Sequence, residues 1–265
     1  MKNERYDDPI TESALRAAMG AQASRFTPHV FSVVDSTNTE AKRRAAEGER
    51  FALLVAESQT AGRGRMGRSF YSPNGTGVYF SVLYTVRDPL SGVVSITSAA
   101  AVAVRRAILR TCGIETEIKW VNDLIYRGKK VCGILAESVA RIDESGACSI
   151  VIGIGINLRS AAFPSELAGI AGTLENQTVD RAALVAAVLD ELVPFLDNGA
   201  DRSWVEDYRR YSCVIGRPIT WRSGESLCAG VAVDVDEDGA LLVRDQEGRE
   251  HRLATGEISV RLQEG

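Results

Sequence analysis

Histidine is scarce in this sequence: His29 and His251 are the only two among its 265 residues. An HExxH metal site is therefore excluded, and a Ser-His-Asp hydrolase is disfavoured, because both need imidazoles placed by their neighbours. Any chemistry must rest on arginine, lysine, carboxylates and backbone amides.

Closely spaced cysteines are also lacking. The five cysteines lie far apart and form no CxxC motif: Cys112, Cys132, Cys148, Cys213 and Cys228. This spacing predicts free, mostly buried thiols in a reducing compartment rather than a disulfide framework or a zinc site.

Long apolar runs and an excess of positive charge are missing too. No stretch approaches the roughly 18 uncharged apolar residues of a membrane helix, and the first residues, MKNERYDDPITES, contain no apolar signal region. We therefore expect a soluble, cytoplasmic protein with no membrane partner. The formal net charge of −4 argues against nucleic acid as the main partner, because duplex binding usually needs a basic surface.

What is present suits one sizeable core with a small satellite domain, since 45% of the residues are hydrophobic. Capping signals and apolar periodicity predict helices over residues 11–19, 38–47, 93–109, 181–195 and 202–211. Apolar and β-branched runs predict strands over 51–57, 78–86, 117–120, 124–126, 131–139 and 149–157. Five short β-runs follow Gly216, around residues 219, 229–235, 241–243, 250–253 and 258–262, separated by turn formers. We predict an α+β domain over residues 1–214 and a small SH3-like β-barrel over 215–265.

The segment from Gln59 to Arg68 contains three glycines in a known pattern. Gly62, Gly64 and Gly67 satisfy G-x-G-x-x-G, and a predicted strand precedes them. A dinucleotide site also requires a helix directly afterwards, whereas the residues that follow, SFYSPNGTGVYFSVLY, are aromatic, turn-forming and then strand-like. The Rossmann interpretation is therefore rejected.

Two other interpretations of this segment stay open. Its glycines permit a loop whose amides point inward as an anion nest, and Arg63, Arg65 and Arg68 add three permanent cations. Because guanidinium groups bind phosphate through paired hydrogen bonds, such a loop suits a triphosphate or an acyl phosphate. The alternative is a solvated basic hairpin, which the spacing favours equally.

The segment KWVNDL, at residues 119–124, places a cation, an amide and a carboxylate in one turn between predicted strands. A lysine at a strand entrance, such as Lys130, can stabilise charge that develops during group transfer. Asp123 can accept a proton from an incoming amine. The alternatives are an ordinary hairpin turn at Lys129 and Lys130 and a turn cap at Asn122 and Asp123.

Two further polar positions have two interpretations each. Thr37 and Glu40 have the spacing of a capping box, which is a structural role. The run from Ser36 to Thr39 offers more polar groups than a cap needs, and it can also hydrogen-bond a polar ligand head. Asn157 ends a predicted buried strand whose glycines allow close backbone approach to a ligand, so its amide can contact a base edge.

Together, and in this order along the chain, these segments resemble the biotin–protein ligase family from about residue 30 to the C-terminus. The matching segments are Ser36 to Asn38, Gln59 with Gly62 to Arg68, Phe70 to Pro73, Lys119 to Leu124, Lys130 to Glu137, Gly155 to Asn157 and Gly256 to Ser259. The arginine–glycine loop and the KWxNDL segment are highly specific in combination. Val121 departs from the family's usual proline, and Phe70 departs from its common tryptophan, although a phenyl ring still stacks.

The resemblance implies an α+β catalytic domain with a class II aminoacyl-tRNA synthetase-like mixed sheet, followed by the SH3-like barrel. It implies an ATP-dependent biotin–protein ligase that uses Mg²⁺, forms biotinyl-5′-AMP and releases pyrophosphate. Biotin then passes to a lysine of a biotin carboxyl carrier protein or domain. The arginine–glycine loop would order over the reactive anhydride and exclude water.

Residue roles follow from the same resemblance. The residues expected to bind biotin are Ser36, Thr37, Asn38, Gln59, Arg63, Gly64, Arg65, Lys130 and Gly133. The residues expected to bind ATP and the adenylate are Arg63, Arg65, Arg68, Phe70, Asn122, Lys130 and Asn157. The catalytic candidates are Lys130, Arg65, Lys119 and Asp123.

Three alternatives compete with this assignment. A lipoate or octanoate ligase would share the catalytic domain but not the loop followed by KWxNDL. A transcription regulator of the family would carry an N-terminal winged helix-turn-helix, yet about 35 residues with one predicted helix precede Ser36, so we expect the short form without sequence-specific DNA binding. A non-catalytic binding protein is disfavoured by Lys130. The sequence is compatible with a monomer or a homodimer.

Overall fold

The computed structural model describes residues 9–86, 93–142, 147–159, 163–176, 178–223, 226–254 and 258–260. Gly256 and Glu257, from the last segment that resembles the family, lie outside these residues.

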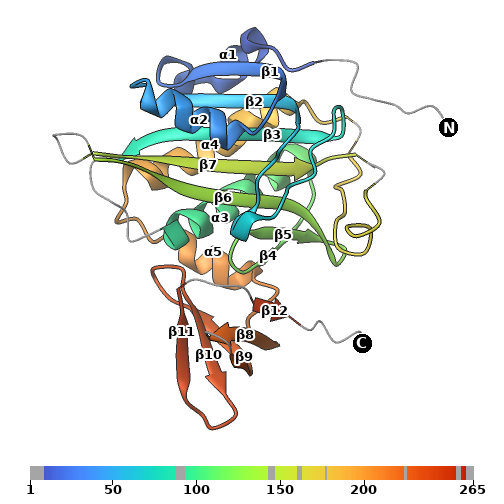
Figure 1. Cartoon of the computed structure of the whole chain (residues 1–265), viewed down its shortest axis with the longest axis vertical. Helices are drawn as coiled ribbons and strands as arrows, with labels where there is room; N and C mark the ends of the chain where they lie inside the picture. The colour runs from blue at the N-terminus through green and yellow to red at the C-terminus, as the bar shows by residue number, and fades with distance from the viewer. Residues whose placement is uncertain are drawn as a thin grey trace.

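A seven-stranded mixed sheet forms the larger part of the chain (Figure 1). Its strands are β1 (Thr27–Val34), β2 (Ala52–Gln59), β3 (Gly77–Val86), β4 (Glu117–Lys119), β5 (Asp123–Tyr126), β6 (Lys129–Ile142) and β7 (Cys148–Asn157). They lie in the order β1-β2-β3-β7-β6-β5-β4, with β1 and β2 parallel and the other neighbouring pairs antiparallel. The apolar, β-branched runs of β3 and β7 pair along their whole length at the centre. The predicted α+β architecture with a mixed sheet is confirmed.

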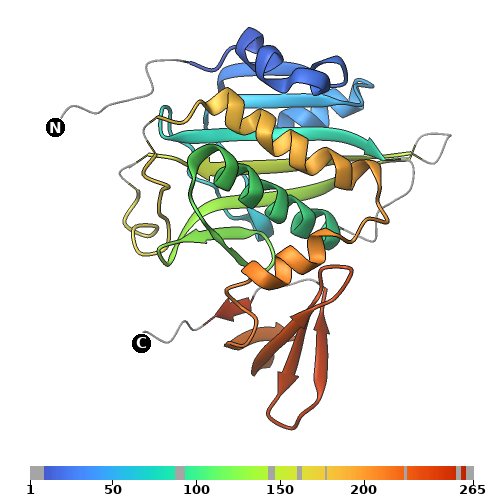
Figure 2. The same ribbon diagram turned by 180° about the vertical axis from the view of Figure 1, so that it is seen from behind.

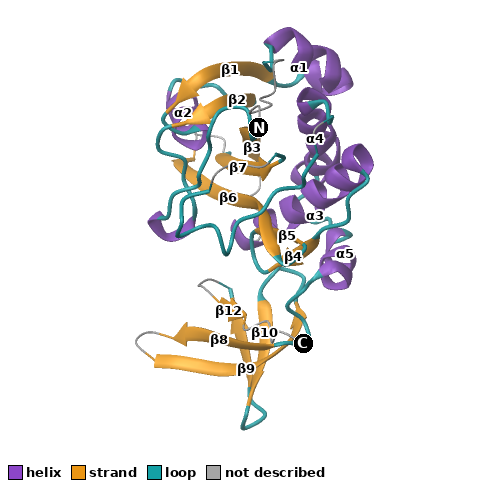
Figure 3. Cartoon of the chain, turned by 90° about the vertical axis from the view of Figure 1, so that its right-hand side faces the viewer, coloured by secondary structure: helices purple, strands orange, loops and turns teal. Residues whose placement is uncertain are grey.

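Helices cover the two faces of this sheet unequally. They are α1 (Glu12–Met19), α2 (Thr37–Ala46), α3 (Val93–Cys112), α4 (Arg181–Asp197) and α5 (Trp204–Tyr211), with two 3-10 turns, η1 (Gly20–Ser24) and η2 (Arg65–Gly67). Helices α1, α3 and α4 lie on one face (Figure 2), and α2 lies on the other (Figure 3). The alanines of α3 let it pack closely against α4, and Ala100, Ala101 and Ala103 are wholly buried. None of the described helices has the length and apolar character needed to cross a membrane.

Strand β1 is an element that the sequence analysis does not predict. It is an edge strand that contains Pro28 and leaves Val33 60% exposed, so it lacks the continuous apolar run of a central strand. Its parallel register runs from Thr27 opposite Ala52 to Val34 opposite Gln59. Because β1 leads directly into α2, this register places the start of α2 beside the end of β2.

The start of α2 is built differently from a capping box. Ser36 is the N-cap residue, and its side chain makes no capping hydrogen bond. Glu40 pairs with Arg43 at 2.9 Å and with Arg44 at 3.1 Å. The capping-box interpretation is therefore wrong, and the Thr37 hydroxyl is directed toward the sheet.

The C-terminal residues form a second, five-stranded antiparallel sheet below the first (Figure 1). Its strands are β8 (Pro218–Ser223), β9 (Ser226–Val235), β10 (Leu241–Asp245), β11 (Glu250–Leu253) and β12 (Ile258–Val260), in the order β11-β10-β9-β8-β12. The five predicted β-runs are confirmed, and this sheet is hereafter the C-terminal barrel. The domain boundary at residue 214 stays a prediction.

The cysteines are free thiols, as predicted, but they are less buried than predicted. Cys132 is buried and the other four are partly exposed, so the expectation of mostly buried thiols is wrong. Burial raises the pKa of the Cys213 thiol to about 11 and that of Cys132 still further. Both thiols therefore stay protonated and poorly nucleophilic at neutral pH.

Candidate active site

The predicted site residues come together around one cavity of about 580 Å³ on the α2 face of the sheet. The cavity is lined by every residue predicted to bind biotin, bind ATP or act in catalysis: Ser36, Thr37, Asn38, Gln59, Arg63, Gly64, Arg65, Arg68, Phe70, Lys119, Asn122, Asp123, Lys130, Gly133 and Asn157. Five of these side chains are cationic and one, Asp123, is a carboxylate. The cavity therefore favours a polyanionic ligand.

The predicted site residues in the cavity wall fall into two main groups. The neutral cluster comprises Ser36, Thr37, Asn38 and Gln59, at the start of α2 and the end of β2. The charged cluster comprises Arg65, Lys119, Asn122, Asp123 and Lys130, on the arginine–glycine loop, the β4–β5 turn and the start of β6. A ligand that fills the cavity would meet uncharged hydrogen-bonding groups and cations together.

The neutral cluster is held by hydrogen bonds within the protein. The backbone N–H and the hydroxyl of Thr37 donate to Gln59 Oε1 at 2.9 and 3.2 Å. Gln59 Nε2 donates to Ser72 Oγ at 2.9 Å, and Ser81 Oγ donates to Thr37 Oγ1 at 2.7 Å. Neither serine is predicted from the sequence to act in the site, although Ser72 lies in the segment from Phe70 to Pro73 that resembles the family. The one signal for Ser81 is that it is a polar residue interrupting the apolar run of β3.

Asn38 is fixed even more completely. Its amide nitrogen donates to Glu137 Oε2 at 2.9 Å and to Leu135 O at 3.3 Å, and its amide oxygen accepts from Ser81 Oγ at 2.6 Å. Only glycine fits opposite it, because a Cβ at position 153 would lie 2.0 Å from Asn38 Oδ1. The polar atoms of Asn38 thus bind protein groups that hold α2 on the sheet.

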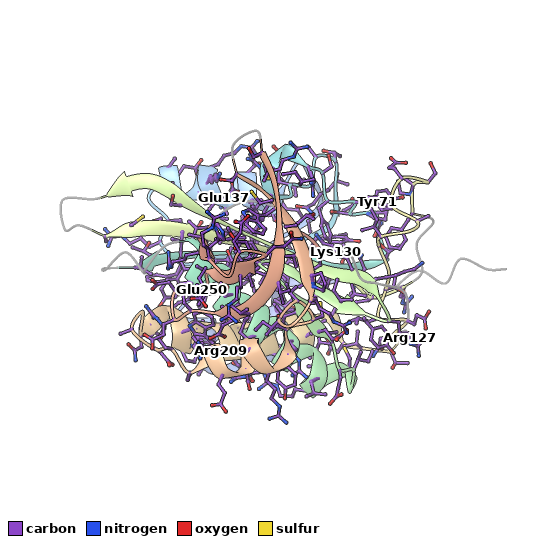
Figure 4. All side chains as sticks on the ribbon, turned by 90° about the horizontal axis from the view of Figure 1, so that it is seen from below. Tyr71, Arg127, Lys130, Glu137, Arg209 and Glu250 are labelled. Carbon is purple, nitrogen blue, oxygen red and sulfur yellow. The ribbon has the colours of Figure 1, made fainter. Side chains whose placement is uncertain are left out.

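Glu137 links this cluster to the arginine–glycine loop. Its Oε1 accepts from Lys42 Nζ at 2.7 Å and lies 3.4 Å from the guanidinium of Arg63. Partial burial opposes ionisation of Glu137, but the hydrogen bonds from Lys42 and Asn38, together with the charges of Lys42 and Arg63, outweigh burial and lower the pKa of its carboxyl. Glu137 is labelled with Lys130 and Tyr71 in Figure 4.

The arginine–glycine loop forms a short hairpin. Phe70 N donates to Gly62 O at 2.9 Å, and Gly64 N donates to Arg68 O at 2.7 Å. The Gly64 amide is thus used across the hairpin, so the predicted nest of inward-pointing amides is wrong for that residue. The basic-hairpin alternative describes the backbone correctly, while the arginine side chains still line the cavity.

Phe70 follows this hairpin and packs on the floor of the cavity. Gly133 of β6 and Gly155 of β7 are direct partners in the sheet. A Cβ at Gly155 would lie 2.4 Å from the Phe70 ring, and a Cβ at Gly133 would lie 3.0 Å from it. The two glycines therefore let the aromatic ring approach the strands, which any side chain there would prevent.

The charged cluster contains closely spaced charged groups. Lys130 Nζ forms an ion pair with Asp123 Oδ1 at 2.6 Å. Arg65 donates to Asn122 Oδ1 at 3.4 Å, a long contact. An anionic ligand group in the cavity can compete with Asp123 for Lys130.

The neighbouring lysines have different surroundings. The β5–β6 turn is made by Arg127 and Gly128, whose φ angles are +50° and +74°. Lys129 and Lys130 are the first residues of β6, so their side chains alternate. Lys129 donates to Ala168 O at 3.2 Å, whereas Lys130 faces the cavity. The hairpin-turn interpretation therefore accounts for residues 127–128 and not for Lys130.

An apolar segment after β7 also lines the cavity, and the sequence analysis missed it. Its lining residues are Phe163, Leu167, Ile170 and Ala171. The segment is tied to the sheet because Lys130 N donates to Ile170 O at 2.9 Å and Asn157 Nδ2 donates to Gly172 O at 3.0 Å. These apolar residues follow neither a helical nor a strand period, so no pattern identifies them.

The comparisons with known proteins agree with this geometry. The profile of the biotin/lipoate A/B protein ligase family matches residues 30–157, and that of the biotin protein ligase C terminal domain matches residues 214–261. A biotin–[acetyl-CoA-carboxylase] ligase from Mycobacterium tuberculosis is 31% identical over 268 residues, covering 96% of this chain and 97% of that protein. The bifunctional ligase/repressor BirA of Bacillus spizizenii is 34% identical over 252 residues, covering 90% of this chain and 76% of that protein.

Solved structures with bound ligands are similar as well. Biotin protein ligase from Aquifex aeolicus, in complex with biotin and ATP, superposes with a TM-score of 0.75 at 28% identity, covering 89% of this chain and 98% of that one. The enzyme from Leishmania major, in complex with biotinyl-5-AMP, superposes with a TM-score of 0.58 at 25% identity, covering 86% and 99%. The chain belongs to the biotin–protein ligase family.

Proposed function

We propose that this protein joins biotin to AMP at the expense of ATP and then transfers biotin to a lysine of a carrier protein. The observation that carries the proposal is the single cavity in which the neutral and charged clusters meet. Biotin combines a polar, uncharged ureido ring with an apolar chain that ends in a carboxylate. Its ring suits the neutral cluster and its carboxylate suits the charged cluster.

In the first step a biotin carboxylate oxygen attacks the α-phosphorus of ATP. A carboxyl–phosphate bond forms, the bond between the α- and β-phosphates breaks, and pyrophosphate leaves with the electron pair. The reaction brings anions together, so cations fixed in advance must offset their repulsion. Arg65 and Lys130 hold the carboxylate and the α-phosphate, and Lys119 adds a third positive charge to the same cluster. Arg63 and Arg68, on the hairpin, take the remaining phosphates.

The ureido ring is recognised by Ser36, Thr37 and Gln59, with Gly64 and Gly133 allowing close approach. Asn38 has a supporting role, because its amide already binds Glu137, Ser81 and a backbone carbonyl. We therefore expect Asn38 to hold α2 in place and not to touch biotin.

The nucleotide occupies the other part of the cavity. Asn122 lies beside the phosphates and ribose, and Phe70 and Asn157 contact adenine. An aromatic ring offers a face for stacking, and the apolar residues of segment 163–171 provide further cover.

Mg²⁺ would be held chiefly by the nucleotide. Among the described residues, no three histidine, cysteine, aspartate or glutamate side chains stand close enough to bind a metal. Asp123 is the one carboxylate in the cavity lining, and Mg²⁺ commonly uses one or two carboxylates together with substrate phosphates. When bound, the ion would neutralise charge on the polyphosphate.

In the second step the amine of a carrier lysine attacks the acyl carbon of biotinyl-5′-AMP. A carbon–nitrogen bond forms, AMP leaves, and the amine loses a proton. Asp123 is the acceptor for that proton, since it is the one carboxylate in the cavity lining. Given the name of the M. tuberculosis relative, the carrier is the biotin carboxyl carrier domain of a carboxylase.

The proposal is tested by offering the protein one acid at a time. Biotin, lipoate or octanoate would be incubated with ATP, Mg²⁺ and the matching carrier domain, and acylated carrier would be measured by mass spectrometry. Biotin attachment, with pyrophosphate released even without carrier, is the expected result. Activity with lipoate or octanoate alone would make the protein a ligase of the related class. Binding of biotin without any pyrophosphate would make it a non-catalytic binding protein.

A further inference from the structure

The C-terminal barrel contacts residues 119–123, hereafter the KWVND segment, through one buried hydrogen bond. The indole N–H of Trp120 donates to the carbonyl oxygen of Gly239 at 2.8 Å. We infer that Trp120 and Gly239 are positioning residues, through which the barrel fixes the turn that carries Lys119, Asn122 and Asp123 into the cavity. The inference rests on the proposed function of that cavity.

In the catalytic domain, the donor of this hydrogen bond, Trp120, is a buried residue. The residue is 4% exposed, and the indole nitrogen can only donate, so burial obliges it to find an acceptor. Gly239 supplies that acceptor. Trp120 itself lines the cavity, as do Lys119 before it and Asn122 after it in the chain. Any movement of the indole therefore moves the backbone between two cavity residues.

On the barrel side, the acceptor is held rigidly in the turn between β9 and β10. Gly239 N donates to Asp236 O at 3.0 Å. Asp236 Oδ1 accepts from Ala240 N at 2.9 Å, and Asp236 Oδ2 accepts from Arg252 at 2.6 Å. The carbonyl of Gly239 is thus aimed at Trp120 by a braced turn.

Glycine is required at this contact. Gly239 has a φ of +84°, and a Cβ there would lie 2.7 Å from Ser98 Oγ on α3. A side chain would therefore push the turn away from α3 and from Trp120. The fit indicates that the barrel turn is shaped to reach the catalytic domain and is not a loop that happens to lie near it.

A second set of contacts holds the same segment. Cys213 N donates to Ile118 O at 3.0 Å, and the Tyr208 hydroxyl donates to Val121 O at 3.4 Å. Helix α5, which carries Tyr208, is itself bound to the barrel: Arg209 makes hydrogen bonds of 2.7 and 3.0 Å to Asp234. Arg209 is labelled in Figure 4. The KWVND segment is therefore held by α5 and the residue that follows it as well as by the barrel turn.

The positions of Arg65 and Lys130 depend on this segment. Asn122 is bonded to Ile134 through backbone and side chain, at 2.9 and 3.1 Å, and its Oδ1 accepts from Arg65. Asp123 lies against Lys130. Because a displacement of about 1 Å can slow an enzyme about 100-fold, a small shift of Trp120 is enough to misplace the charged cluster. Biotin's ureido ring, at the neutral cluster, should be affected much less.

The test compares Trp120→Phe, which keeps an aromatic ring and loses the donor, with Trp221→Phe as a matched control. Trp221 is also buried, at 5% exposed, and packs against His251 within the barrel. Gly239→Ala perturbs the same contact from the barrel side. For each full-length variant, three quantities are measured below its melting temperature: the kcat and KM of biotin-dependent pyrophosphate release, biotin binding by calorimetry, and hydrogen–deuterium exchange of residues 118–124.

We expect Trp120→Phe and Gly239→Ala to lower kcat by about 10- to 100-fold and to leave the biotin affinity within about threefold. Exchange should accelerate in residues 118–124 and not in β7. Trp221→Phe should keep kcat within about twofold. Equal loss of kcat in Trp120→Phe and Trp221→Phe, or unchanged exchange in residues 118–124, would overturn the inference. A wild-type protein that makes no biotinyl-5′-AMP would overturn the proposed function, and the exchange experiment would still decide the inference.

Discussion

The two clusters of the cavity differ in how their polar groups are satisfied. Thr37 and Gln59 of the neutral cluster are hydrogen-bonded to each other and to serines of the surrounding framework at 2.7–3.2 Å. In the charged cluster, Asn122 is bonded to Ile134, whereas Lys130 is held by its ion contact of 2.6 Å with Asp123. The neutral cluster is therefore held by hydrogen bonds between uncharged groups, whereas Lys130 makes an ion contact that an anionic ligand can replace.

The largest effect is expected from removing charge in the charged cluster. Lys130→Ala and Arg65→Ala should each slow biotinyl-5′-AMP formation by about 100- to 1,000-fold, because each removes a cation that offsets developing negative charge. Single-turnover formation of the adenylate is the measurement. Lys129→Ala is the matched control, since Lys129 contacts the carbonyl of Ala168 and leaves the charged cluster intact. Equal losses in Lys129→Ala and Lys130→Ala would remove the distinction between the two lysines.

A smaller and more selective effect is expected in the neutral cluster. Thr37→Val keeps the shape of the side chain and leaves Gln59 and Ser81 without their Thr37 hydroxyl partner. The KM for biotin should rise about tenfold, in line with one lost buried hydrogen bond, and the KM for ATP should stay unchanged. Steady-state kinetics with each substrate varied in turn measures this. Thr39→Val, on the same helix, is the control, and a parallel rise in both KM values for Thr37→Val would show that the two clusters are not separate.

The smallest effect is expected at Glu137, where the neutral cluster meets the loop. Glu137→Gln should lower the free energy of unfolding at pH 7 by about 1 kcal/mol or less, because solvent screens the charges of Lys42 and Arg63. The pKa of Glu137 is lowered in the folded protein from its ordinary value near 4.5. The stabilisation that ionised Glu137 gives the fold is therefore complete at pH values above about 4.5, and it is lost as the pH falls through the pKa of the folded protein.

Denaturant unfolding of wild type and Glu137→Gln at several pH values checks this prediction. The stability gap should be widest near neutral pH and should close in acid. Asp245→Asn is a useful comparison, because the pKa of Asp245, on β10, is also lowered, chiefly by its hydrogen bond from His251. A Glu137→Gln gap that persists unchanged at acidic pH would contradict an ionic role for Glu137.

The sequence predicts most of this fold, because the responsible signals are local. Thr11 caps α1 as expected, accepting from Ala14 N at 3.1 Å, and glycine or polar turns separate the five strands of the barrel. Strand β1 escapes prediction since an edge strand buries less apolar surface. The predicted capping box at Thr37 is not formed because the Thr37 hydroxyl makes a hydrogen bond with Ser81, which lies far away in the sequence, in place of a local capping bond.

The sequence predicts the residues that line the site but not the residues that hold them in place. The family resemblance identifies Arg65, Asn122 and Lys130 as site residues, whereas residue type and spacing alone are equally compatible with a basic hairpin and turn caps. Partners such as Ser81 and Gly239 lie far away in sequence, and the turn pattern that contains Gly239 does not predict which residue its carbonyl will contact. Whether a glycine carbonyl will accept from a tryptophan more than one hundred residues earlier is decided by tertiary packing alone.

The most direct test of the two-cluster account is a crystal structure of the protein with a non-hydrolysable analogue of biotinyl-5′-AMP. The account predicts the ureido ring at Thr37 and Gln59, with the bridging phosphate beside Arg65 and Lys130. It also predicts that Lys130 exchanges its contact with Asp123 for the ligand. A ligand in the reverse orientation, or a phosphate that leaves the Lys130–Asp123 contact unchanged, would contradict the account.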